Sequence, residues 1–472
     1  MTQYRLRTTA LDEAGCAALH AATTEVLEQT GVEVQHERAL ALLAKAGAQV
    51  DGTRVRIPAG LVDDALAAAP RSVPLTSRSG AGGLTLESGP VYYGTGSDCL
   101  YLLGPGAKDR RPVSLADVED LAALQEKLPN IDFVMSMAHP HELSAAFAPV
   151  AQFAAMLRGT GKPLIMVPEL AADIDLFNEM AAACGAADSW ALYAMPTPPL
   201  VHGEHSAARL VRCAELGVPM VYASALLQGA TAPASRAGCL VLANAEMLSG
   251  LVIAELAQPG APFVYGVAQG AMNARTAHVV YSSPEEMAVQ QASADLARFY
   301  GLPTFGYGGC SDSLMLDEQW AFEAGMTLLT AAQAGVTLLH DIGYVASGTA
   351  SAYESVVVMD ELVGWVKAYL DGVTIDAEAL AVDEIAAVGP GGTHLARKYT
   401  RKHVRDYVMP QLLSQEQYDS WSGAGGSTLL ERTAQKTKEL RESERPYGLE
   451  PDVLRQLEEL VEKARGEREG AA

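Results

Sequence analysis

Eight short apolar runs, separated by helix-like segments, constrain the fold of this chain more than any other feature. Each run has the length and the β-branched or aromatic content of a buried strand, and alanine-rich stretches with apolar residues at helical spacing separate most of them. The expected strands are Val91–Thr95, Phe133–Met137, Pro163–Val167, Leu192–Met195, Pro219–Ala223, Phe263–Val267, Thr304–Tyr307 and Thr337–His340. The clearest expected helices are Leu115–Leu128, Ala207–Leu216, Ala237–Leu256 and Pro284–Tyr300. This count of strands and helices predicts an α/β protein built on a (β/α)8 TIM barrel.

The stretch from Gly301 to Gly348 shows the repeating unit most plainly. A strand-like run ends at Tyr307, a polar cluster follows over Cys310–Ser313, and a helical segment then covers about Glu318–Ala334. A second apolar run ends at His340 and is again followed by polar residues. Because parallel α/β folds keep their chemistry just beyond the carboxyl ends of the strands, we expect the functional residues there.

A doubly wound open sheet is the main alternative architecture. Such sheets usually have fewer strands and carry a glycine-rich phosphate-binding fingerprint between the first strand and the first helix. Gly94-Thr95-Gly96 is rich in glycine, but it leads into Ser97–Tyr101 rather than into a helix. The barrel is therefore the favoured fold.

Segments with other patterns flank the expected barrel. Residues 1–85 hold two amphipathic helical stretches, a hairpin centred on Asp51-Gly52 and a third helix that starts at Pro58, which together predict a small N-terminal α/β region. A flexible joint is expected over Gly80–Gly83, before a catalytic barrel of residues 86–372. Residues 373–472 lack the alternation and contain polar helical stretches at Leu429–Glu442 and Val453–Ala464, which predict a C-terminal helical appendage.

The charge balance narrows the range of partners. The chain has 57 acidic residues against 34 Lys and Arg, a formal net charge of −23. Binding to nucleic acid depends on basic surface that displaces counterions, so we expect no nucleic-acid partner. An acidic surface suits a cationic ligand or a basic partner, but it is also an ordinary means of staying soluble.

The sequence suggests a cytoplasmic protein with no membrane partner. The first residues lack the apolar core of a secretory signal, and no run of about 18 apolar residues is found. The six cysteines are scattered and form no CxxC pair, so we expect neither a disulfide framework nor a structural zinc site. Cys310, in the polar loop, is interpreted as a buried or incidental thiol.

Polar and aromatic side chains just beyond the strands should gather at one face of the barrel. The carboxylates expected there are Asp98, Glu169, Glu204, Asp312 and Asp341, and the aromatic residues are Tyr92, Tyr93, Tyr193, Tyr222, Tyr307, Trp320 and Tyr344. The histidines at or just past strand ends are His139, His141, His202, His205 and His340. Asp312 could hold a cation, act as a base, or simply cap the helix that follows it.

A metal-dependent hydrolase is an alternative function for such a barrel. His139-Pro140-His141 places two histidines after a strand, as first metal ligands are placed in hydrolases of this kind. His202 and His205 could supply the later pair and Asp341 the terminal carboxylate. However, no lysine follows the fourth strand, and the proline between the first two histidines turns His141 elsewhere.

Several short motifs follow one another along nearly the whole chain. They are Leu27–Val34, Leu42–Gly47, Val55–Pro58, Leu128–Val134, Gly161–Pro163, Gly229–Pro233, Ala243–Glu246, Ser311–Ser313, Asp317-x-Gln319 and Met359–Glu361. This series resembles the trimethylamine methyltransferase family. Since only standard residues are present, it is most similar to the pyrrolysine-free branch, which includes glycine betaine methyltransferases. One departure is Leu314, where family members often have lysine.

The resemblance implies a barrel that moves a methyl group from a quaternary or tertiary methylated amine to the cobalt of a corrinoid on a separate small protein. No tightly bound cofactor of its own is expected, and homo-oligomers are compatible with the alanine-rich helix faces. A homologue that binds a methylated amine without catalysis is a further alternative.

The residues suit this implied chemistry. A quaternary ammonium leaves as a neutral amine, so attack by Co(I) needs no general acid, and the protein mainly positions and stabilises charge. The expected groups around the cation are Tyr93, Asp98, Glu204, Tyr307 and Asp312. The expected donors to the carboxylate of a betaine are His202, His340 and Tyr344. We assign no catalytic residue.

Overall fold

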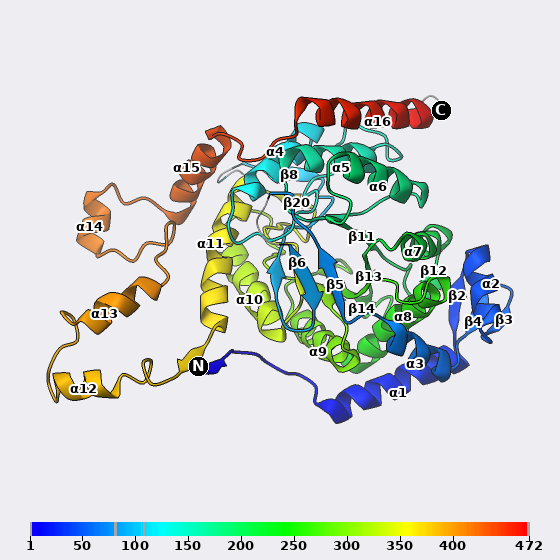
Figure 1. Cartoon of the computed structure of the whole chain (residues 1–472), viewed down its shortest axis with the longest axis horizontal. Helices are drawn as coiled ribbons and strands as arrows, with labels where there is room; N and C mark the ends of the chain where they lie inside the picture. The colour runs from blue at the N-terminus through cyan, green and yellow to red at the C-terminus, as the bar shows by residue number, and fades with distance from the viewer. Residues whose placement is uncertain (1, 80–82, 105, 107–108, 470–472) are drawn as a thin grey trace.

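The computed structural model describes residues 2–79, 83–104, 106 and 109–469, and a closed barrel of parallel strands lies at its centre (Figure 1). Seven strands pair in parallel in the order β10, β11, β13, β15, β18, β19, β7. Their bounds are β7 (Tyr92–Tyr93), β10 (Leu164–Met166), β11 (Trp190–Ala194), β13 (Met220–Ser224), β15 (Phe263–Val267), β18 (Thr304–Tyr307) and β19 (Leu338–His340). Two parallel bridges, Gly94 to Phe133 and Val134 to Leu164, supply the eighth position and close the ring. The predicted (β/α)8 barrel is confirmed.

Helices surround the barrel as the sequence pattern predicts. They are α4 (Leu115–Glu126), α5 (Ala148–Gly159), α6 (Ala172–Ala183), α7 (Glu204–Leu216), α8 (Arg236–Ala257), α9 (Pro284–Tyr300), α10 (Glu318–Ala334) and α11 (Tyr353–Leu370). Gly217 and Gly301 end α7 and α9 with φ values of 68° and 70°, a left-handed conformation that costs glycine little. Among the described residues, α8 alone is long and apolar enough to cross a membrane, yet 78% of its apolar window is buried inside the protein.

A β-hairpin fills the amino-terminal end of the barrel. It consists of β5 (Ser72–Leu75) and β6 (Leu84–Glu87), whose apolar side chains pack with interior residues such as Phe305 and Leu338. Thr337, just before β19, donates a hydrogen bond to the carbonyl of Glu87 at 3.1 Å. This arrangement closes one end of the barrel and leaves its carboxyl end for a functional site.

Short strands surround that carboxyl end. One three-stranded sheet contains β8 (Tyr101–Leu103), β9 (Arg110–Pro112) and β20 (Ala350–Ser351). The other contains β14 (Leu227–Gln228), β16 (Gly270–Met272) and β17 (Val279–Val280). Each strand belongs to a segment that follows a barrel strand, so these sheets fix the segments that carry the site.

The N-terminal region is joined to the barrel through a shared sheet. Strands β2 (Val32–Val34), β3 (Gln49–Asp51) and β4 (Arg54–Arg56) combine with β12 (Val201–His202), which follows β11 of the barrel. The remaining elements are α1 (Glu13–Gln29), α2 (Glu37–Lys45) and α3 (Ala59–Ala68), and all three pack against α8. Residues 80–82 of the expected joint lie outside the described residues, and the boundaries at 85 and 372 stay predictions.

The C-terminal region leaves the body and then returns to it (Figure 1). After α11, β21 (Val373–Ile375) pairs with β1 (Thr2–Tyr4). The outlying elements are α12 (Val382–Val388), α13 (Lys398–His403), the 3-10 turn η1 (Val404–Asp406) and α14 (Tyr418–Gly423). The returning helices are α15 (Leu429–Glu442), which packs on α11 and α4, and α16 (Pro451–Glu469), which packs on α5 and α6. Both returning helices cover the polar stretches predicted to be helical.

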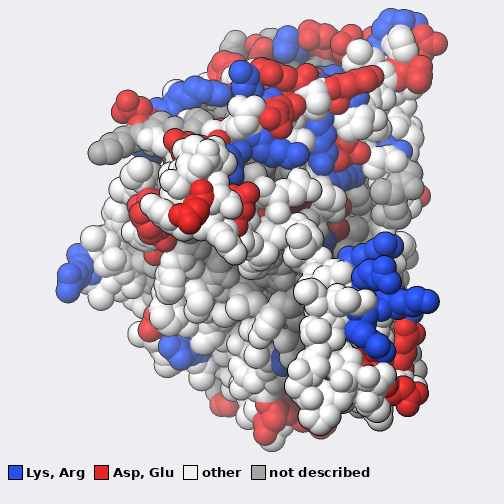
Figure 2. Space-filling view, turned by 90° about the vertical axis from the view of Figure 1, so that its left-hand side faces the viewer, with Lys and Arg blue, Asp and Glu red and all other residues white. Residues whose placement is uncertain are grey.

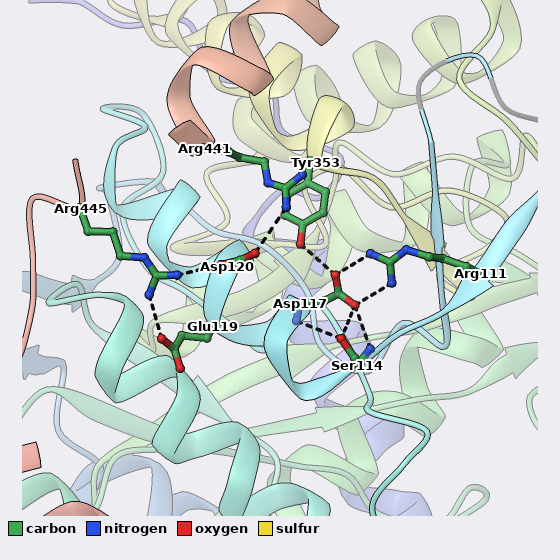
Figure 3. A network of polar contacts seen from close by, with 8 residues as sticks. All are labelled: Arg111, Ser114, Asp117, Glu119, Asp120, Tyr353, Arg441 and Arg445. Carbon is green, nitrogen blue, oxygen red and sulfur yellow. Dashed lines mark hydrogen bonds and ion pairs between the residues drawn. The ribbon is translucent and has the colours of Figure 1, made fainter. Parts of the chain in front are cut away.

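A network of charged side chains fastens the returning segment to α4 (Figure 3). Arg445 bonds Glu119 and Asp120 at 2.8 Å each, and Arg441 lies 4.0 Å from the ring centroid of Tyr353. Tyr353 donates to Asp117, which also receives two hydrogen bonds from Arg111 at 2.6 and 2.7 Å. Burial alone would raise the pKa of Asp117, but these bonds and those from Ser114 hold it below its usual range.

The hairpin in the barrel predicts a large stability effect at Leu86. Replacing this fully buried side chain by alanine leaves a cavity, so Leu86→Ala should lower the free energy of unfolding by about 2–5 kcal/mol, measured by denaturant unfolding. The control Leu395→Ala changes a side chain that is 82% exposed and should alter stability by less than about 0.5 kcal/mol. Equal effects of the two changes on the free energy of unfolding would contradict tight packing of the β5–β6 hairpin in the barrel.

Candidate functional site

Aromatic rings converge at the carboxyl end of the barrel. The ring of His340 stacks on Phe305 with centroids 3.9 Å apart and planes at 13°. Tyr193 lies 4.9 Å from Phe305 and 6.0 Å from His340. Tyr307 lies 6.3 Å from His340 and meets the edge of Tyr281 at 5.2 Å. We call these five residues, together with Asp341 and Tyr344, the mouth cluster.

Closure of the barrel brings Asp341 and Tyr344 into this cluster. The hydroxyl of Tyr344 donates a hydrogen bond to the carbonyl of Ser97, in the segment after β7. A Cβ on the adjacent Gly96 would collide with the ring of Tyr344 and with Oδ1 of Asp341. Asp341 itself has a φ of 67°, a strained conformation for a residue other than glycine. Close packing of two loops therefore holds the carboxylate of Asp341 in place.

The mouth cluster combines one carboxylate with neutral phenols. Burial raises the pKa of Tyr193, Tyr281 and Tyr344 above the ordinary value, and the negative charge of Asp341 raises each of them further. These tyrosines therefore remain neutral at physiological pH and present their ring faces. A carboxylate surrounded by aromatic rings is an environment that stabilises an organic cation.

His340 retains hydrogen-bonding capacity within the cluster. Its side chain is only 5% exposed, and its Nδ1 lies 2.7 Å from Oδ1 of Asp341. That contact lacks hydrogen-bond alignment, so both ring nitrogens are without a hydrogen bond to the described part of the chain. A buried nitrogen without a partner is costly, which makes His340 a ready donor or acceptor for a bound molecule.

Asp312 joins neighbouring loops through hydrogen bonds and does not cap a helix. Its carboxylate accepts hydrogen bonds from the backbone N–H of Tyr281 at 3.0 Å and of Ser282 at 2.9 Å, and from the hydroxyls of Ser282 and Ser347. The cap of α10 is Asp317, five residues later. Asp312 thus positions Tyr281 over Tyr307, and its own oxygens are already occupied.

Asp98 lies at the rim beside His139. Its side chain is 42% exposed, and its Oδ1 is 3.9 Å from Nδ1 of His139, whose pKa this contact raises. His141 points away, is exposed and lies against the ring of Tyr101. Among the described residues no three His, Cys, Asp or Glu side chains come together as a metal-binding group. The arrangement of side chains therefore gives the hydrolase hypothesis no support.

Three of the residues expected at the site lie elsewhere. Tyr93 points away from the barrel interior toward α11, with Nζ of Lys367 4.9 Å from its ring centroid. The ring nitrogens of His202 bond Tyr222 and Ser249, each at 2.7 Å, between the barrel wall and α8. Glu204 is the exposed first residue of α7. His340, Tyr307 and Tyr344 do come together, Asp98 stands at their rim, and Asp312 supports them.

Two cysteines near the mouth cluster are buried thiols. Burial raises the pKa of Cys99 and Cys310 well above the ordinary value, and the negative charge of Asp341 adds to this effect. Both remain protonated at neutral pH, which makes them poor nucleophiles. The interpretation of Cys310 as a buried thiol is confirmed.

Sequence reasoning missed Tyr281, and it placed Asp341 at the active face and in the metal alternative without giving it a role in holding the cation. Tyr281 follows β17, in a segment of 16 residues (268 to 283 inclusive) between β15 and α9. A length well above that of ordinary strand–helix connections was the available signal. Asp341 directly follows the strand that ends at His340, and this strand-end position is why the sequence places it at the active face.

The structural role of His202 predicts a specific pH dependence. Burial lowers its pKa to about 4, so the unfolded chain, with a pKa near 6.5, binds the proton more readily. The folded state should therefore lose about 3 kcal/mol from this group as pH falls from 7 to 4. Denaturant unfolding of the wild type and of His202→Gln should differ by that pH-dependent amount. A pH-independent difference would contradict a buried neutral imidazole.

Comparison with known proteins places these features in context. The family model described as "Trimethylamine methyltransferase (MTTB)" matches residues 2–469. The glycine betaine methyltransferase of Desulfitobacterium hafniense strain Y51 is 30% identical, over 94% of each chain. The trimethylamine methyltransferase MttB of Methanosarcina barkeri strain Fusaro is 28% identical, over 95% of this chain and 93% of that protein.

Solved structures support the fold. The monomethylamine methyltransferase MtmB of Methanosarcina barkeri superposes with a TM-score of 0.53 over 97% of this chain and 88% of that one. The hydroxylamine complex of MtmB gives a TM-score of 0.55 over 92% and 89%. Identity is 11% and 12%, so these structures show a shared architecture alone.

Proposed function

Because the chain belongs to the trimethylamine methyltransferase family and is thus a methyltransferase, we propose that it moves a methyl group from a quaternary or tertiary methylated amine, of the betaine kind, to Co(I) of a corrinoid on a separate protein. The observation that carries the proposal is the carboxylate of Asp341 among the rings of the mouth cluster. The betaine methyltransferase relative, similar over the full length, also supports it.

Charge recognition accounts for the choice of a methylated ammonium. Its positive charge is spread over methyl groups that cannot donate ordinary hydrogen bonds, so ring faces and a carboxylate are the suitable partners. Tyr193 and Tyr281 flank Asp341 as neutral phenols. Two carboxylates side by side would favour a metal cation. Asp98, the other carboxylate expected here, lies at the exposed rim and so does not form such a pair with Asp341.

Nε2 of His340 suits the carboxylate of a betaine, because Asp341 lies against the other ring nitrogen, Nδ1. Tyr344 already donates to Ser97, and His202 lies between the barrel and α8, so neither is available as the donor expected from the sequence. His340 lies in the same cluster as Asp341 and keeps both nitrogens without hydrogen bonds. A zwitterion could thus place its cationic end among the rings and its anionic end on this imidazole.

The reaction needs little from the protein beyond position. When the C–N bond of a quaternary ammonium, or of a tertiary amine bound in its protonated form, breaks, its electron pair stays on nitrogen. The amine then leaves uncharged, so no side chain has to deliver a proton. The bond to the methyl group forms with the electron pair that the corrinoid supplies when bound. The mouth cluster holds the cation, and its rings exclude water from it.

The methyl acceptor has to come from outside the chain. Cys99 and Cys310 are the thiols near the mouth cluster, and the raised pKa of each keeps it protonated. A protonated thiol is a poor nucleophile, so these residues fit a site whose acceptor is delivered by a partner protein. We place this reaction in the cytoplasm as part of the same proposal.

Removing the charge of Asp341 should impair turnover. Asp341→Asn preserves the shape of the side chain, and loss of one desolvated charge contact should reduce kcat/KM for a methylated amine about tenfold or more. The measurement is the loss of Co(I) cobalamin absorption with glycine betaine and other quaternary amines. The matched control, Asp64→Asn on the exposed face of α3, should leave the rate unchanged. Wild-type rates in Asp341→Asn would contradict the proposal.

His340 should discriminate between amines with and without a carboxylate. His340→Phe keeps the stack on Phe305 but removes both nitrogens. We expect kcat/KM to fall at least about tenfold for glycine betaine and much less for tetramethylammonium, which lacks a carboxylate. A uniform loss with both substrates would show that the ring acts only by packing.

The reaction class itself is tested with the wild-type protein. Turnover of any methylated amine with Co(I) cobalamin or a cognate corrinoid protein supports the proposal. Binding of glycine betaine without turnover under these conditions would favour a homologue that has lost catalysis.

A further inference from the structure

Residues 376–411 form an arm that stands away from the body and is anchored at both ends. Its first end follows β21, which pairs with β1. At its second end, the carboxylate of Glu361 accepts hydrogen bonds from the backbone N–H groups of residues 411, 412 and 413, at 2.7 to 2.9 Å. Leu412 is buried there. Figure 1 shows α12 and α13 projecting beside α11. The anchors direct the arm outward.

The arm has no core of its own. None of its described residues is buried. Its exposed large apolar residues are Leu380, Val382, Ile385, Leu395, Val404, Tyr407, Val408 and Met409. Helices as short as α12 and α13, with seven and six residues, are marginal in water without a surface to pack on. So many exposed apolar side chains on one segment mark a contact surface.

The body carries exposed apolar side chains on α10 and α11, which we call the α10–α11 patch. Phe322 and Met326, one turn apart on α10, are 69% and 40% exposed, and Tyr369 on α11 is 53% exposed. Helices α10 and α11 pack together, and the arm leaves the end of α11 (Figure 1). Figure 2, which faces this side, shows broad uncharged surface between the charged groups. An apolar projection and an apolar patch on one chain are what a self-complementary two-fold interface needs.

The arm carries no net charge, which suits a contact between two copies of an acidic chain. Five basic residues lie within ten positions of the arm: Arg397, Lys398, Arg401, Lys402 and Arg405. In the described part of the chain, no ion pair forms on Lys398, Arg401 or Arg405. Five acidic residues of the arm balance the five basic ones: Asp376, Glu378, Asp383, Glu384 and Asp406. Because each chain has a net charge of −23, a contact between two copies is favoured where the surface is neutral, as it is on the arm. The arm's 36 residues (376 to 411 inclusive) also exceed the roughly 20–30 per side of a standard interface.

We infer that the protein self-associates through this arm, with the arm of one chain packing on the α10–α11 patch of a second copy. The inference is independent of the proposed function. Light scattering during gel filtration of the full chain should give at least twice the 49.7 kDa of one copy. The double variant Leu395→Asp, Met409→Asp should give a single-copy mass. Because both side chains are more than three-quarters exposed, its circular dichroism and unfolding should match the wild type.

The control Leu216→Asp places the same change on α7, on the opposite side of the barrel in Figure 1, and should preserve the assembly. A second test pairs Phe322→Cys with Leu395→Cys. It should give a disulfide between chains on a non-reducing gel that neither single variant gives, since five of the six native cysteines are buried. A single-copy mass for the wild type, an unchanged mass for the double aspartate variant, or absence of the cross-link would each overturn the inference.

Discussion

Closure of the barrel between β19 and β7 is the constraint on which the site depends. The two strands are about 245 residues apart in sequence, yet Leu338 pairs with Tyr92 and Leu339 with Tyr93. This pairing sets the loop after β7 directly against the loop after β19. Gly96 then lies where any Cβ would strike Asp341 and Tyr344. The position of the Asp341 carboxylate is therefore a property of the closed ring, and neither loop could hold it alone.

Local signals in the sequence were strong enough to predict most elements. The helices α9 and α10 have the predicted bounds, because Pro284 and Asp317 mark their starts and Gly301 and Gly335 their ends. The strands were found for a similar reason, since each is a short apolar run bounded by turn residues. Such signals act over a few residues, and so they specify elements well. They do not specify which face of a strand points inward.

The misplaced site residues show the limits of that reasoning. Tyr92 and Tyr93 are neighbours with opposite orientations, so an error of one residue in register moves a ring from the barrel interior to its outside. His202 lies outside the site because it belongs to β12, which pairs with β2 of the N-terminal region. The paired residues are about 168 positions apart in sequence, so no local pattern predicts the contact. Asp312 was correctly expected near the site, but its carboxylate is occupied by backbone and hydroxyl donors that only the folded loops bring to it.

In the mouth cluster, aromatic rings surround the carboxylate of Asp341, and Nε2 of His340 has no hydrogen bond to the described part of the chain. We therefore expect positive charge, rather than shape alone, to select the ligand. Calorimetric binding of glycine betaine and of 3,3-dimethylbutanoate tests this directly, because the two have nearly the same shape and the same carboxylate but only betaine carries the cation. We expect betaine to bind at least about tenfold more tightly than 3,3-dimethylbutanoate. Equal affinity, or preference for the neutral head, would contradict it.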